Sequence, residues 1–177
     1  MVEGVESEYL NAKERAMMML GLSDQSRMPS NRQIKECIES LTKAELGEDE
    51  VKRRLQEMRE IAHAIMISID DFDPHLIGST LSGQIRATSD IDLHAYCDEV
   101  EGLMNRLGDC GYEDIEEERI ENRKGNFIHL RWTEQGYPVE ITVYPWSWRE
   151  LVLYSSVTGK PMKRADLKAV SGLIRER

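Results

Sequence analysis

Three acidic residues stand in strand-like segments where their carboxylates could act together. Asp90 and Asp92 alternate with apolar residues in the segment Ser-Asp-Ile-Asp-Leu, and Glu140 stands between two apolar residues in Val-Glu-Ile. Residues two apart share one face of a strand, so Asp90 and Asp92 point the same way. If the two strands are neighbours, three carboxylates converge on one polar face. Carboxylates that crowd together repel each other and their pKa values rise, and a divalent cation such as Mg²⁺, which prefers oxygen ligands, relieves that repulsion.

A glycine and a serine precede these carboxylates at a spacing that suits phosphate binding. Gly78 and Ser79 follow the short apolar segment His-Leu-Ile, and Gly83 comes four residues after Ser79. Glycine lets the backbone approach a ligand closely, and exposed backbone N–H groups at the start of a helix attract phosphate. Two Mg²⁺ ions about 3.5–4 Å apart can clamp the attacking and leaving oxygens of a phosphoryl displacement. The pattern therefore suits a bound triphosphate and a metal-assisted phosphoryl displacement.

Each of these features has a simpler interpretation when it is taken alone. Asp90 and Asp92 could be solvated carboxylates at the start of a strand, and Glu140 could be a solvent-facing strand residue. The combination with the Gly-Ser pair favours a functional site. His94 shares the face of Asp92, and a hydrogen-bonded structural histidine is its favoured interpretation.

Together these segments resemble the signature of the DNA polymerase beta-like nucleotidyltransferase superfamily. Their spacing is similar to that of its small bacterial members, the minimal nucleotidyltransferases. The resemblance covers residues 75–97, and the family core would extend to about residue 145. It implies a mixed sheet flanked by helices, and transfer of a nucleoside monophosphate from a nucleoside triphosphate to an acceptor, with release of pyrophosphate.

The resemblance also implies roles for the acidic residues. Asp90 and Asp92 would hold two Mg²⁺ ions, for which Mn²⁺ could substitute. Glu140 would bind the ion nearer the acceptor and could accept the acceptor's proton as a base.

The same resemblance implies a set of nucleotide-binding residues. Gly78 and Ser79 would contact the triphosphate, and Ser89 belongs to the same set. Many minimal members carry a basic residue just before the second glycine, where this chain has Ser82. Arg86 and Lys160 are the candidates to supply positive charge to the phosphates, although an exposed surface charge is an equally good interpretation of each.

The patterning around these motifs predicts an α+β fold with a mixed β-sheet, a nucleotidyltransferase core flanked by helices. Ser30 and Gln33 predict a capping box at the start of a helix that reaches about Leu41. A longer helix after Gly47 carries an apolar stripe that must lie on a core. Further helices are predicted over Ser7–Leu20, 99–107, 147–155 and 163–175, and strands over 75–78, 91–97, 113–121, 126–133 and 138–144. We expect a helical N-terminal extension over 1–48, the core over 49–146, and C-terminal helices over 147–177 that pack on it.

Composition limits the partners of this chain. Its 177 residues include 23 Lys and Arg against 33 Asp and Glu, a net charge of −10. Such a surface repels polyanions, and Lys124 and Arg131 are too isolated to form a basic patch, so broad nucleic-acid binding is not expected. The longest apolar stretch, Ala16–Leu22, is too short to span a bilayer, and because the N-terminus is acidic we expect no signal peptide. Three cysteines outside any C-x-x-C pair favour a reduced, cytoplasmic protein.

The leading hypothesis is therefore a cytoplasmic, Mg²⁺-dependent nucleotidyltransferase with a two-metal mechanism. Its donor would be a nucleoside triphosphate, with ATP expected, and its acceptor a hydroxyl group of a protein side chain or a small molecule. A partner protein is one candidate acceptor. The alternative is a catalytically inactive module that binds nucleotide or a protein partner, suggested by Ser82 and by N-terminal helices that match no subfamily.

Overall fold

The computed structural model describes residues 3–22, 28–122, 125–154 and 161–175. The chain divides into two units, one formed by Met1–Leu41 with Val152–Met162 and the other by Thr42–Leu151 with Lys163–Arg177. The second unit contains every residue of the candidate site except Lys160. The domain boundaries expected after residues 48 and 146 stay predictions.

Helices dominate the N-terminal part of the chain. Helix α1 spans Glu3–Met19 and α2 spans Asn31–Leu46, so α2 continues beyond the predicted end near Leu41. The capping box is confirmed, because the Ser30 N–H donates to Gln33 Oε1 at 2.8 Å and the Gln33 N–H donates to Ser30 Oγ at 3.1 Å. These two bonds satisfy N–H groups that a helix start would otherwise leave free.

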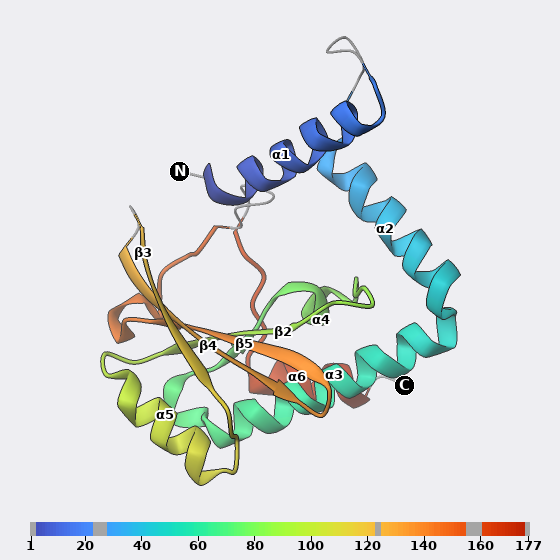
Figure 1. The fold of residues 1–177 in the computed structure, drawn as a ribbon. Coiled ribbons are helices and arrows are strands. Elements are labelled where there is room, and N and C mark those ends of the chain that lie inside the picture. Colours follow the sequence, from blue (N-terminus) through green and yellow to red (C-terminus); the bar gives the residue numbers. More distant parts are fainter. Residues whose placement is uncertain (1–2, 23–27, 123–124, 155–160, 176–177) are drawn as a thin grey trace. The chain divides into compact units, whose positions relative to one another are not determined.

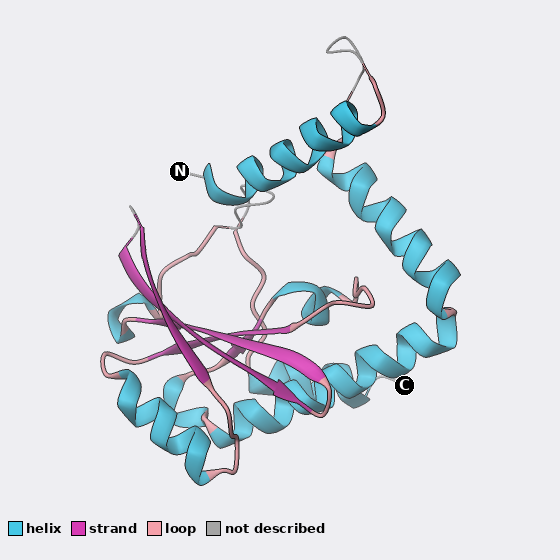
Figure 2. Ribbon diagram, viewed as in Figure 1, coloured by secondary structure: helices cyan, strands magenta, loops and turns pink. Residues whose placement is uncertain are grey.

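The second unit is built on a five-stranded sheet with the strand order β1-β2-β5-β4-β3 (Figure 2). Strand β2 pairs with β5 in parallel, and the other neighbours are antiparallel. This confirms the predicted α+β class with a mixed sheet flanked by helices. The strands are β1 (His75–Leu76), β2 (Ile91–Tyr96), β3 (Glu116–Asn122), β4 (Gly125–Glu134) and β5 (Tyr137–Tyr144).

Two hairpins join the last three strands. Gln135 and Gly136 link β4 to β5 with φ angles of 50° and 84°, and two successive positive φ values are typical of a type I′ turn. Asn122 pairs with Gly125 at the other hairpin. The two hairpins together fix β4 between β3 and β5.

Helices α3 (Glu48–Ser68), α5 (Val100–Asp109) and α6 (Leu167–Arg175) lie on one side of the sheet (Figure 1). Alternate strand residues point toward them, as in β5, where every second residue from Tyr137 to Val143 is buried. The apolar stripe of α3 joins this core, as predicted. None of the described helices combines the length and the apolar character needed to cross a membrane. The fully buried core includes Met58, Ile65, Ile69, Leu76, Ile91, Leu93, Leu103, Leu107, Leu130 and Ile141.

The helix predicted over 147–155 is wrong for the residues described there. Trp146–Trp148 form a single 3₁₀ turn after Pro145, and the chain then runs without regular structure to Leu153. Leu151 and Val152 are 47% and 60% exposed. A helix here would have no apolar face to bury, and burial of such a face supplies most of a helix's stability.

The last helix begins later than the predicted residue 163. Ala165 forms an antiparallel bridge with Leu76, in which each N–H donates to the other's carbonyl at 2.9 Å. This pairing holds the backbone extended before Leu167, because a residue bonded to a strand neighbour cannot also join a helical turn.

Candidate active site

The sheet brings Asp92 and Glu140 together. The parallel pairing of β2 and β5 sets Asp92 directly beside Glu140. Ile91 and Leu93 are fully buried in the core, so Asp92 points to the opposite face, and Glu140 points the same way between buried neighbours. Asp90 immediately precedes β2 and is exposed. The predicted convergence of Asp92 and Glu140 on one face is therefore present in the register of the sheet.

Gly78 lies against the carboxylate of Asp92. A Cβ atom at position 78 would stand 3.1 Å from Asp92 Cγ and closer still to Oδ2, and Gly78 has a φ of +69°. Both the space and the backbone angle therefore require glycine here. The Ile77 N–H donates to the Asp92 carbonyl at 3.0 Å, which fixes this turn to the start of β2.

The turn continues into α4 (Gly78–Ser82), which Thr80 ties to the acidic strand. Thr80 is fully buried, and its hydroxyl donates to the Asp90 carbonyl at 3.1 Å. From α3, Arg59 Nε donates to the Thr80 carbonyl at 3.2 Å. A hydroxyl and a guanidinium therefore couple the Gly-Ser turn to both the helix layer and the acidic strand.

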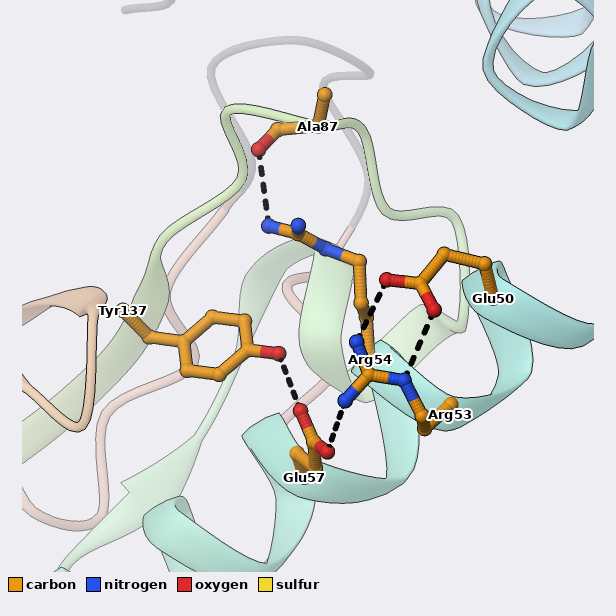
Figure 3. Close-up of polar contacts among 6 residues, drawn as sticks. All are labelled: Glu50, Arg53, Arg54, Glu57, Ala87 and Tyr137. Carbon is orange, nitrogen blue, oxygen red and sulfur yellow. Dashed lines mark hydrogen bonds and ion pairs between the residues drawn. The ribbon is translucent and has the colours of Figure 1, made fainter. Parts of the chain in front are cut away.

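The loop between α4 and β2 is held by residues near the start of α3 (Figure 3). Arg54 donates to the Ala87 carbonyl at 3.0 Å, and its guanidinium lies over the Tyr137 ring at 5.3 Å. The Tyr137 hydroxyl donates to Glu57 Oε2 at 2.6 Å, and Glu57 also pairs with Arg53. This network fixes the chain just before Asp90 and links it to the first residue of β5.

The remaining predicted nucleotide-binding residues differ in their positions. Ser79 is partly exposed in the Gly-Ser turn. Ser89 is 8% exposed, and its hydroxyl accepts the Arg86 N–H at 2.8 Å, so it closes the loop. The Arg86 side chain is exposed in this loop. Lys160 lies outside the described residues. The phosphate contacts expected of these four residues stay predictions.

Burial and charge act on the Asp92 carboxyl in the same direction. Burial, and then the negative charges of Asp90 and Glu140, raise the pKa of Asp92 to about 7. A nearby cation would stabilise the ionised form of this carboxyl group and lower its pKa.

Glu140 has the opposite environment. Its Oε1 lies 2.8 Å from His129 Nδ1, and Arg131 Nε donates to its Oε2 at 2.6 Å. These hydrogen bonds lower the pKa of Glu140 to about 2, although burial acts the other way. A carboxylate with so low a pKa is a weak base at neutral pH, which argues against the base role expected of Glu140.

His94 is buried beside these groups and is not a hydrogen-bonded histidine of the expected kind. It is 2% exposed, and its Nδ1 has no hydrogen-bond partner among the described residues. Its ring meets Tyr144 edge-on at 4.8 Å, and Tyr144 stacks on Trp148 at 5.9 Å. Burial, followed by the charge of Arg164, lowers the pKa of His94 to about 3, so the ring is neutral at physiological pH.

The donor atoms suit a divalent cation at Asp90 and Asp92 better than at Glu140. Hard cations take carboxylate oxygens, and Asp92 has a raised pKa because it is buried and because the negative Asp90 and Glu140 are nearby. Both oxygens of Glu140 are instead engaged by basic side chains. Across residues 3–22, 28–122, 125–154 and 161–175, no three His, Cys, Asp or Glu side chains form a ready metal cluster.

Sequence reasoning missed the two residues that engage Glu140. His129 and Arg131 are two apart in a predicted strand, so the shared face was accessible from the pattern. Their closeness to Glu140 depends on the pairing of β4 with β5, which sets Arg131 directly beside Glu140. Arg131 is thus part of the site, although in the sequence it stands out only as an isolated basic residue.

Comparison with known proteins gives weak matches. No family model matches the chain, and no curated protein matches it. Among solved structures, Cid1, described for its RNA terminal uridylyl transferase activity, matches with a TM-score of 0.38 and 17% identity over 51% of this chain and 30% of that one. The polymerase core of TRAMP, an RNA surveillance complex, matches with a TM-score of 0.36 and 20% identity over 62% and 38%.

A Cid1 poly(U) polymerase structure gives a similar result, with a TM-score of 0.37 and 16% identity over 64% of this chain and 37% of that one. The chain spans about a third of the length of these structures. All three TM-scores lie below 0.5.

Proposed function

We propose that this protein is a Mg²⁺-dependent nucleotidyltransferase that transfers a nucleoside monophosphate from a nucleoside triphosphate to a hydroxyl acceptor. The observation that carries the proposal is the placement of Gly78 against Asp92, with Glu140 beside Asp92 in the parallel β2–β5 pairing. A glycine turn that closely approaches a carboxylate face suits a triphosphate held by backbone and metal together.

Each residue has a distinct part in this proposal. Asp90 and Asp92 hold the divalent cation, which supplies positive charge to the triphosphate when it is bound. The turn at Gly78 and Ser79 positions the phosphates. The acceptor oxygen forms a bond to the α-phosphorus, the bond from that phosphorus to the bridging oxygen breaks, and pyrophosphate leaves. The hydroxyl proton passes to water.

The donor and the acceptor are proposed as chemical classes. A nucleoside triphosphate is the donor, with ATP expected. The acceptor is a hydroxyl group of a protein side chain or of a small molecule. The net charge of −10 disfavours a long nucleic acid as the acceptor, because the acidic surface of the protein would repel a polyanion.

The test is thermal unfolding of the full chain with Mg²⁺ and each nucleoside triphosphate in turn, combined with a pyrophosphate release assay. A nucleotide at about 100 times its Kd adds about 2.7 kcal/mol to the free energy of unfolding. We expect a Mg²⁺-dependent rise in Tm that Asp92→Asn abolishes. The matched control is Asp109→Asn, an exposed acidic residue at the end of α5. No Tm rise with any nucleotide would refute the proposal.

One observation favours an alternative, a module that binds nucleotide without transferring it. Glu140 is engaged by His129 and Arg131, so this third carboxylate is not free to bind an ion or accept a proton next to the acceptor hydroxyl. This alternative predicts a nucleotide-dependent rise in Tm without pyrophosphate release, with every class of hydroxyl acceptor supplied.

A further inference from the structure

The contacts of Glu140 bear on the number of metal ions in the site. Three neighbouring strands place Asp92, Glu140 and Arg131 side by side in one row across the sheet. Glu140 therefore has a carboxylate on one side and a guanidinium on the other. His129 completes its surroundings through Oε1.

Arg131 is fixed by two carboxylates. Its Nε donates to Glu140 Oε2 at 2.6 Å, and its Nη1 pairs with Glu118 on β3. Charge-assisted bonds of this kind are about twice as strong as neutral ones. A guanidinium stays protonated throughout the physiological pH range, so its positive charge beside Glu140 is permanent.

This arrangement opposes a second divalent cation at Glu140. Such an ion would have to displace the guanidinium from Oε2, or else lie next to its positive charge. Asp92 differs, because its neighbour in the row is the Glu140 carboxylate and, among the described residues, no basic side chain forms an ion pair with it. Glu140 is thus the paired carboxylate of the row, and Asp92 is the one without a basic partner.

We propose that Arg131 takes the place of a second divalent cation at Glu140, so that the chain binds one divalent ion, through Asp90 and Asp92. The inference rests on the proposed function, since it concerns the metal content of the same site. It replaces the expectation of two ions with one ion and one fixed guanidinium. Metal dependence should then follow a single-site curve.

The test counts bound Mn²⁺ on the full chain, without nucleotide, by the loss of the electron paramagnetic resonance signal of free Mn²⁺. Ions bound by Asp92→Asn give the background of the acidic surface. Above that background we expect one ion per chain for the wild type and two for Arg131→Met. Arg119→Met is the matched control and should keep one ion, because Arg119 is an exposed arginine on β3 that pairs with Glu117.

Each outcome has a definite meaning. Two ions on the wild type, or one ion on a folded Arg131→Met variant, would overturn the inference and leave the proposed function standing. No ion above background on the wild type would overturn both. If Arg131→Met fails to fold, the wild-type count still decides, and Arg131→Lys, which keeps a positive charge, must also bind one ion.

Discussion

The buried carboxyl group of Asp92 should make the metal-free protein less stable than its Asp92→Asn variant at alkaline pH. In the folded protein the pKa of Asp92 is raised from 3.8 to about 7 by burial and by Asp90 and Glu140. Below pH 3.8 the group is protonated in both the folded and the unfolded states, so it costs nothing. Between pH 3.8 and about 7 the folded state keeps a proton that the unfolded state has already released, so each rise in pH favours the unfolded state and stability falls.

The size of the effect follows from this difference. About 3 pH units correspond to about 4 kcal/mol, which is an upper limit because the site is partly open to solvent. The asparagine amide also loses hydration on burial, at a cost of about 1–3 kcal/mol. We therefore expect Asp92→Asn to raise the free energy of unfolding by about 2 kcal/mol at pH 8, or the Tm by about 4–8 °C.

The assay is thermal unfolding in a metal-chelating buffer from pH 3.5 to pH 8.5, followed by circular dichroism. Near pH 3.5 only the cost of burying the amide remains, so Asp92→Asn should be less stable than the wild type; its relative stability should rise through the neutral range and level off as a gain above about pH 7. Asp109→Asn, at an exposed position, is the matched control for the substitution itself. A Tm difference that is constant with pH, or a less stable Asp92→Asn variant at pH 8, would refute the electrostatic reasoning.

Three further changes test the positioning of the site and the first unit. Gly78→Ala should lower the Tm through its left-handed φ and the contact with Asp92, whereas Gly108→Ala in α5, where a Cβ meets nothing within 4 Å, should leave the Tm unchanged or raise it. Tyr137→Phe removes the hydrogen bond to α3 and should cost about 1 kcal/mol in urea unfolding, with no loss counting against that bond. Ser30→Ala breaks the capping box and should cost about 1 kcal/mol, seen as lower helical ellipticity; unchanged ellipticity would contradict that role.

Much of the local structure was predictable because its causes are local. The capping box at Ser30 and the apolar stripe of α3 each depend on residues a few positions apart. The helix predicted over 147–155 failed because helical spacing is not sufficient where the helix has no core to cover.

The sequence by itself determined the chemistry-bearing turn and strand. Gly78, Asp90 and Asp92 lie within one short segment, so residue types and strand periodicity were enough to predict a glycine turn followed by a strand that carries Asp92. Asp92 lies against the Gly78 turn because strand β1, just before the turn, pairs with β2, which carries Asp92.

The tertiary structure decided what surrounds Glu140. Strand β5 joins β2 on one side and β4 on the other, which places Arg131 and His129 on the third carboxylate. Strand order is set by burial and hydrogen bonding between segments far apart in the chain, and these leave no mark in the local pattern of any one strand. For this reason the sequence predicted three crowded carboxylates, whereas the fold pairs one of them with a fixed arginine.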